Sequence, residues 1–572
     1  MTTSRTRRGL LATALLVTAL WLPTPAMAGT PAEAPGSATG SYLAGRFAQH
    51  HDDWRAAAQY LSHALSADPD ELSLLRRTYM LRLSEGRIEA ALDLAQRLVE
   101  RDAEPQIAAT LLIADSLARD RLDDAEAMSR RMPRDGMAKF LGPLLDAWLA
   151  VARKDTERAV QALSALTAAT GFSALHNLHA GLVLDLGGRP ADAERHYAEV
   201  VKTEAPLRVV QIVGNHYERV GRKDEARKLY ERFRADNPDS LMIEPALKTL
   251  DAPRPPAPTI ADARQGMAEA LFDLGSALHH EGAEETALLF GRIALHLRPD
   301  LALARIMIGD IMEARDHHDE ALAEYKTLEN DPVLGWSARL RAADVLARME
   351  RHDEASAMFA RLAQERPERT DALVRLGDVY RAGKRYDEAA ATYTTALERI
   401  GTPAERHWSV FYARALAYDR INRWPDAEAD LKKALELRPD EPYLLNYLGY
   451  SWVDKGQDLE RAKAMIERAV ELKPRDGYII DSLGWALYRT GDFEGAVTRL
   501  ERAVELRPVD ATINDHLGDA YWRVGRRNEA RFQWQRALRT ADEEPLKQQI
   551  EEKLEKGLSD TRAAEAGVPK TQ

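Results

Sequence analysis

The sequence predicts an all-α protein, an α-solenoid built from repeated helix–turn–helix units. Two observations carry this prediction. Alanines recur about every 34 residues, and small residues and prolines keep the same phase beside them. A fixed period of this length marks stacked copies of one supersecondary unit, each of which packs only on its neighbours. Such an array presents a surface and seldom carries a reaction centre.

The alanines form a ladder through most of the chain. The ladder alanines are Ala57, Ala91, Ala125, Ala159, Ala193, Ala226, Ala287, Ala321, Ala355, Ala389, Ala427, Ala462, Ala496 and Ala530. Twelve residues before most of them stands a small residue such as Gly377 or Gly484, and twelve after many of them stands a proline such as Pro439. Apolar residues recur at helical spacing on both sides of a turn. Each unit is therefore a helix, a tight turn, and a second helix that ends at the proline.

The small residues of the first helices have a steric role. A glycine in mid-helix costs about 1 kcal/mol relative to alanine, so its recurrence indicates that another helix approaches closely. The ladder alanine of the second helix lies on the facing side of this close contact. Large side chains four residues after the alanines, such as Tyr393, Leu500 and Trp534, fill the space that remains.

These markers resemble the tetratricopeptide repeat, in which a small residue and an aromatic are followed by alanine, a second aromatic and proline. The resemblance is strong from Met267 to Ala541, with about eight repeats, and weaker from Ser41 to Pro238, with about six. It implies a right-handed superhelix whose concave groove is lined mainly by the first helices. The stretches NYLGYSWVDKG and DSLGWALYRTG also resemble Gram-negative periplasmic or envelope repeat proteins, among them the adaptor of a carboxyl-terminal processing protease.

The chain divides into two predicted arrays with a joint between them. The predicted segments are a signal peptide at 1–28, a disordered leader at 29–40, an N-terminal array of degenerate repeats at 41–238, a Pro-rich joint at 239–266, a C-terminal array at 267–541, a polar capping helix at 542–558 and a disordered tail at 559–572. The joint contains the run APRPPAP from Ala252 to Pro258, which is typical of a stiff linker or an irregular connection.

The N-terminus has the pattern of a bacterial secretory signal peptide. Arg5, Arg7 and Arg8 precede an apolar run from Gly9 to Leu22, and Ala-Met-Ala follows at 26–28. The run is too short to span a membrane comfortably. The sequence therefore predicts export to the periplasm with cleavage after Ala28, by either the Sec or the twin-arginine route, and no integral membrane anchor.

The amino-acid composition excludes several kinds of site and disfavours two kinds of partner. The 572 residues carry a formal net charge of −12 and no cysteine. The missing cysteine excludes thiol catalysis, disulfides, thiolate metal sites and a lipid-modified cysteine. The negative charge disfavours nucleic acid and anionic lipid as general partners, although basic patches such as Arg523, Arg526 and Arg527 occur.

No catalytic motif stands out in the chain. There is no phosphate-binding loop, nucleophile elbow or His-Glu-x-x-His sequence. Adjacent histidines such as His279–His280 and His317–His318 could suggest a metal, but neighbouring residues on a helix point in different directions. The sequence therefore predicts no catalytic, cofactor or metal site, and a protein that is not an enzyme.

The predicted site is a stripe along the first helices of the C-terminal array. Residues six and three before the small residue, and one and four after it, share one helical face. By the resemblance, this face lines the groove, where rings supply contact area and polar groups pair with the backbone of an extended peptide. The predicted binding residues are Tyr412, Tyr443, Asn446, Tyr450, Tyr478, Asp481, Trp485, Tyr488, Asp515, Asp519 and Trp522. The alternative is that several of these rings pack between helices.

The function expected from these features is a non-catalytic periplasmic scaffold or adaptor that binds a protein or peptide segment in its groove. The acidic groove residues favour a basic or neutral guest. Candidate partners are an envelope protease and an assembly complex. The alternative is a component of an envelope polysaccharide-secretion or outer-membrane assembly machine that uses the same groove.

Overall fold

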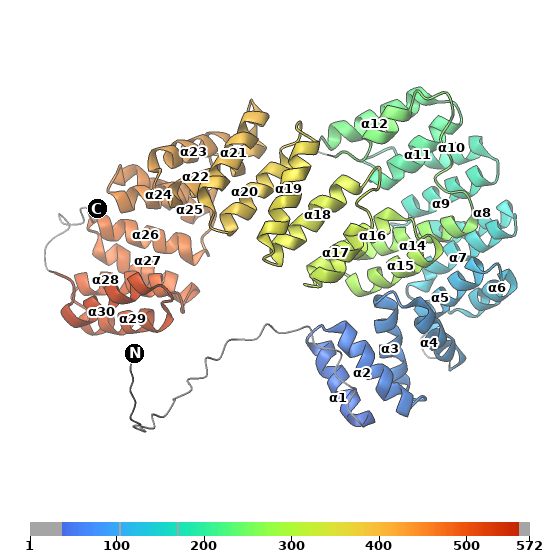
Figure 1. Ribbon diagram of the computed structural model, residues 1–572, viewed down its shortest axis with the longest axis horizontal. Coiled ribbons are helices and arrows are strands. Elements are labelled where there is room, and N and C mark those ends of the chain that lie inside the picture. Colours follow the sequence, from blue (N-terminus) through green and yellow to red (C-terminus); the bar gives the residue numbers. More distant parts are fainter. Residues whose placement is uncertain (1–36, 102–104, 169–170, 239, 560–572) are drawn as a thin grey trace, which may run out of the picture. The chain divides into compact units, whose positions relative to one another are not determined.

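The computed structural model describes residues 37–101, 105–168, 171–238 and 240–559, and all regular elements within these ranges are helices (Figure 1). This confirms the predicted all-α solenoid of helix–turn–helix units. The predicted signal peptide, most of the leader and the tail beyond residue 559 lie outside the described residues.

The helices group into two compact units whose bounds fall inside α12 (Lys223–Asp236) and α16 (Ala302–Ala314). The first unit ends at Leu229 and also contains Ala252–Ala304. Its other helices are α1 (Ala38–His50), α2 (Trp54–Ala67), α3 (Leu72–Ser84), α4 (Ile88–Glu100), α5 (Pro105–Ala118), α6 (Leu122–Arg131), α7 (Ala138–Ala152), α8 (Thr156–Leu163), the 3-10 helix η1 (Ser164–Ala168), α9 (Ser173–Leu186), α10 (Pro190–Val200), α11 (Leu207–Arg219), α14 (Ala263–His280) and α15 (Glu284–Leu297).

The second unit holds Tyr230–Asp251 and the residues from Arg305 onward. Its helices are α13 (Glu244–Thr249), α17 (His318–Lys326), α18 (Gly335–Arg348), α19 (His352–Glu365), α20 (Asp371–Ala382), α21 (Tyr386–Ile400), the 3-10 helix η2 (Glu405–His407), α22 (Trp408–Arg420), α23 (Trp424–Leu437), α24 (Pro442–Lys455), α25 (Leu459–Leu472), α26 (Gly477–Thr490), α27 (Phe493–Leu506), α28 (Ala511–Arg523), α29 (Arg527–Thr540) and α30 (Glu544–Lys556). The units follow packing, whereas the predicted arrays follow repeat register. Residues 230–238 of the predicted N-terminal array belong to the second unit, and residues 267–304 of the predicted C-terminal array belong to the first.

The ladder alanines are completely buried within the repeats. All fourteen have 0% exposed surface. A Cβ atom built on Gly377, Gly484 or Gly518 would lie 2.4–2.6 Å from a side chain sixteen residues later, those of Tyr393, Leu500 and Trp534. This confirms that the small residue of the first helix admits the large residue of the second.

In the first unit, the chain covers the first helices of its own N-terminal repeats. Helix α14 packs against α5, α7 and α9, and α15 packs against α3 and α5 (Figure 1). Gly266 of α14 lies so close to Trp148 that a Cβ atom would meet the indole ring at 2.1 Å. Arg208 of α11 donates to both carboxylate oxygens of Glu269, at 2.5 and 2.6 Å.

A buried ion pair helps to fix α14 in this position. Glu269 has no exposed surface. Burial would raise the pKa of its carboxyl group, but the guanidinium groups of Arg208 and Arg298 outweigh burial and lower that pKa. Removing one partner of such a pair is costly because it leaves the other charge buried and unpaired. The inner face of these N-terminal repeats is therefore filled by the chain itself.

Replacing Ala496 by Leu should overpack the contact between α26 and α27 and lower the free energy of unfolding by about 1–3 kcal/mol. Since each repeat packs on its neighbours, lost protection in hydrogen exchange should concentrate around residues 480–530. Ala391, which is exposed on α21, provides the matched control for the same substitution. Unchanged protection around Ala496 would contradict the role assigned to the ladder.

Candidate binding face on the first helices

The predicted binding residues all lie in the second unit, on four consecutive first helices. Tyr412 is on α22; Tyr443, Asn446 and Tyr450 are on α24; Tyr478, Asp481, Trp485 and Tyr488 are on α26; and Asp515, Asp519 and Trp522 are on α28. Helix α24 contacts α26, and α26 contacts α28. The repeat stacks these helices side by side, and we call this row of eleven residues the aromatic face.

Two tyrosines of the aromatic face are open to solvent. Tyr443 is 44% exposed and Tyr478 is 52% exposed. A cation lies near each ring: Lys473 Nζ is 5.2 Å from the centroid of Tyr443, and the guanidinium carbon of Arg507 is 4.9 Å from that of Tyr478. These two rings, one repeat apart, therefore form an accessible surface with positive charge beside it.

Trp485 is the central ring of a stack of three rings. Its ring stacks on His516 at a centroid distance of 4.1 Å and on Tyr488 at 4.8 Å, with interplanar angles of 14° and 8°. The side chain is half-buried, and its indole N–H has no hydrogen-bond partner within the described part of the chain. Trp485 thus packs between helices and still contributes to the aromatic face.

Tyr412, Asn446 and Tyr450 are half-buried. Tyr412 meets Tyr447 edge to face at 5.9 Å. Burial raises the pKa of Tyr450 above its usual value. The side-chain oxygen of Asn446 is buried and accepts no hydrogen bond from the residues described here. This oxygen is a vacant acceptor between exposed Tyr443 and half-buried Tyr450.

The acidic residues of the aromatic face are neutralised within the chain. His516 Nδ1 lies 3.0 Å from an oxygen of buried Asp481. Lys553 of α30 donates to Asp515 at 2.6 Å and to Asp519 at 2.9 Å. Burial raises the pKa of Asp519 to about 6, although Lys553 opposes that shift. The acidic character from which a basic guest was expected is therefore satisfied inside the molecule.

The chain's own C-terminal segment also engages Trp522. The indole N–H donates to the carbonyl of Leu558 at 3.0 Å, and a Cβ atom on Gly557 would meet the ring at 2.0 Å. Sequence reasoning predicted a capping helix here, but it did not foresee that Lys553 would enter the row of predicted binding residues. His516 was missed as well, although it directly follows Asp515 in the sequence.

A first helix of the first unit shows how such a face holds an extended chain. The carboxamide of Asn215 donates to the carbonyl of Ala257 at 2.8 Å and accepts from the backbone N–H of Thr259 at 3.3 Å. Lys223 donates to the carbonyl of Ala252 at 2.8 Å. The Pro-rich joint therefore lies across these repeats as an extended segment. Asn215 was not singled out from the sequence, although its place directly after Gly214 is a groove position of the repeat.

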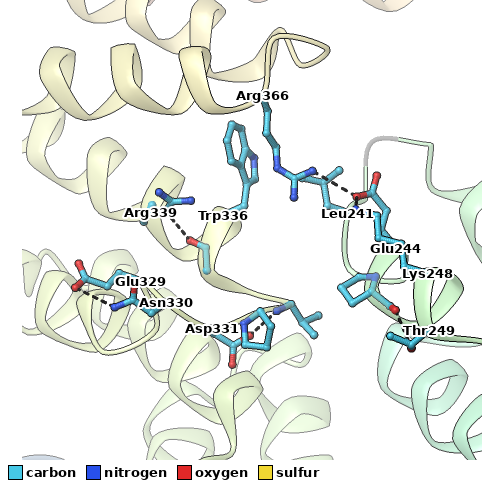
Figure 2. A pocket seen from close by; sticks show the side chains of 14 residues that line it. Leu241, Glu244, Lys248, Thr249, Glu329, Asn330, Asp331, Trp336, Arg339 and Arg366 are labelled. Atoms are coloured by element: carbon cyan, nitrogen blue, oxygen red, sulfur yellow. Dashed lines mark hydrogen bonds and ion pairs between the residues drawn. The ribbon is translucent and has the colours of Figure 1, made fainter. Parts of the chain in front are cut away.

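A separate pocket of about 520 Å³ lies in the second unit, between the segment around α13 and the start of α18 (Figure 2). Its charges are mostly paired: Arg366 lies 3.4 Å from Glu244, and Arg339 lies 2.8 Å from Glu365. None of the predicted binding residues lines this pocket. Because positive and negative groups balance, its lining does not select a ligand of one charge.

The His516–Asp481 pair should make stability depend on pH. Burial alone would lower the pKa of His516, but the charge and hydrogen bond of Asp481 outweigh it and raise that pKa. The folded state then holds a proton that the unfolded state releases near pH 6.5. The stabilisation is complete below about pH 6.5 and is lost as the pH rises through the folded-state value.

Replacing Asp481 by Asn should flatten this slope, which urea unfolding at a series of pH values can measure. Replacement of Asp454, which is exposed on α24, by Asn is the control and should leave the slope unchanged. An equal slope in the D481N variant would show that the pair does not set the pH dependence.

None of the helices in the described ranges is both long enough and apolar enough to cross a membrane.

Comparison with known proteins places the repeats in a family. Models described as a tetratricopeptide repeat match residues 340–404 and 412–477, and a TPR repeat model matches residues 484–525. No curated protein matches the chain in sequence.

Among solved structures, the chain resembles the Cut9–Hcn1 hetero-tetramer of the APC/C at 15% identity and a TM-score of 0.37, over 92% of this chain and 97% of that one. It resembles yeast Tom70 at 15% identity and a TM-score of 0.29, over 91% and 95%. It also resembles YrrB, a TPR protein with an unusual peptide-binding site, at 21% identity and a TM-score of 0.28, over 34% and 97%. The family models thus identify tetratricopeptide repeats in three segments between residues 340 and 525, which the structure forms from α18 to α28.

Proposed function

We propose that the chain is a non-catalytic scaffold that binds a protein or peptide segment on the aromatic face of its second unit. The observation that carries this proposal is a contrast between two sets of first helices. In the first unit, α14 and α15 cover α3, α5, α7 and α9, and the joint lies on α11. In the second unit, Tyr443 and Tyr478 remain exposed on the corresponding helices.

The geometry favours a neutral or mildly acidic extended segment as the guest. The acids of the face are already paired, and the open rings have Lys473 and Arg507 beside them. The flat rings would supply contact area at low conformational cost.

The proposed location is the periplasm, with the signal peptide cut after Ala28. The arginines at the start, the short apolar run and the Ala-Met-Ala site support this proposal. N-terminal sequencing of the protein purified from its native host should begin at Gly29 or within a few residues. A protein that keeps its first residues and stays in the cytoplasm would overturn the location and the class of partner.

The binding role can be tested by site-specific photo-crosslinking. A photoreactive phenylalanine analogue at Tyr478 should give one defined crosslinked adduct in native cells, because that ring faces the proposed guest. The same analogue at Thr498, which is exposed on α27, should not give this adduct. The double change of Tyr443 and Tyr478 to Ala should weaken capture of the same partner by about 2 kcal/mol or more.

Melting temperature separates a binding role from a packing role in this experiment. Because Tyr443 and Tyr478 are exposed, their replacement should leave the melting temperature nearly unchanged. Trp485→Ala should reduce both affinity and melting temperature, since this ring also packs on His516. Equal adducts from positions 478 and 498 would contradict the proposed face.

A further inference from the structure

The outward side of α29, the second helix of the last repeat, differs in charge from the same surface of the preceding repeats. On a helix with 100° per residue, Arg531, Phe532, Arg536 and Arg539 fall within about 140° of one another, opposite the buried Ala530 and Ala537. We call these four residues the arginine patch. It stands out in a chain whose formal net charge is −12.

Comparison of the repeats with one another shows what has changed. Six residues after the ladder alanine stands a basic residue, and in three preceding repeats it pairs with an acid three positions later. The pairs are Lys433–Glu436 at 2.8 Å, Arg468–Glu471 at 2.9 Å and Arg502–Glu505 at 2.7 Å. In α29 the basic residue is Arg536, but the position of its partner is taken by Arg539.

Two arginines of the patch donate to backbone carbonyls of neighbouring segments. Arg531 donates to the carbonyl of Leu554 and Arg536 to that of Pro508, both at 2.8 Å. Within the described residues, no acidic side chain forms an ion pair with Arg531, Arg536 or Arg539. This includes the acidic side chains of α30. The positive charge on this side of the last repeat is thus not neutralised by an ion pair within the described residues.

An aromatic ring stands among these charges. Phe532 is 57% exposed, and the equivalent positions two residues after the alanines are Ala429, Ala464 and Thr498. Exposing a phenyl ring where the three preceding repeats have a small residue brings no gain in packing. Arginine and aromatic side chains are the residues that most often carry binding energy at protein interfaces.

We infer that the arginine patch is a second docking surface, which binds an acidic protein segment carrying an apolar side chain that contacts Phe532. Carboxylates of the partner would take the place of the missing acids, and opposite charge would speed the encounter. This surface belongs to a second helix. Arg531 at its edge lies 5.9 Å from the ring centroid of Trp522, but the inference rests on Phe532, Arg536 and Arg539 and does not depend on the proposed peptide site.

The test uses the mature chain and a fluorescein-labelled peptide of glutamates with one central leucine, with affinity followed by fluorescence anisotropy. Arg539→Glu should weaken binding about tenfold, since one favourable charge becomes an unfavourable one. The same change supplies Arg536 with the partner that Arg468 and Arg502 have, so the melting temperature should hold or rise slightly. Phe532→Thr should weaken binding of this peptide but not of an all-glutamate peptide.

Arg502→Glu on α27 is the matched control, because it reverses a charge at the same repeat position where the arginine is already paired. It should change the peptide affinity less than twofold. Equal losses for the R539E and R502E variants, or no loss for R539E, would overturn the inference. Binding of phosphatidylglycerol vesicles through Arg539 without binding of the peptide would also overturn it, because the patch would then recognise a lipid surface.

Discussion

The close approach of two helices within each repeat is the contact on which the rest of this structure depends. Where Gly377, Gly484 or Gly518 stands, a side chain from the second helix occupies the space a Cβ atom would need. The ladder alanine is buried completely on the other side of that contact. Because both positions admit only small side chains, the angle between the two helices repeats from unit to unit. That regularity sets one face of every first helix side by side with the next.

The two units use these faces in different ways. In the first unit, the buried pair Arg208–Glu269 and the contact of Gly266 with Trp148 hold α14 against the first helices. The pair is hard to separate, since Glu269 has no exposed surface and would remain buried and unpaired without Arg208. The first helices of the first unit thus pack against a later segment of the same chain. In the second unit, Tyr443 and Tyr478 are exposed, and no segment within the described ranges buries their rings.

In the last repeat, the sequence of a single helix does not show which charged side chains are paired. Asp515 and Asp519 look like acids offered to a partner, but Lys553 of α30 lies between them. On α29 the reverse holds, because Arg536, whose counterparts pair with an acid in three preceding repeats, is followed three residues later by Arg539. Net charge along the sequence therefore says little about which surface of the last repeat is charged. Pairing across helices decides it.

The sequence by itself determined the helix pairs, their register and the buried position of the ladder, because these depend on sterics within one 34-residue unit. The spacing of Gly484, Ala496 and Leu500 is enough to predict their contact. It also placed the aromatic residues on one face of the first helices. Only the tertiary structure decided which of those residues stay accessible. The ring of Trp485 stacks on His516, and Asp519 accepts a hydrogen bond from Lys553. Asn215 accepts a hydrogen bond from the backbone N–H of Thr259 in the joint. These contacts join different repeats or segments outside the repeats, where no periodic pattern records which side chains will meet.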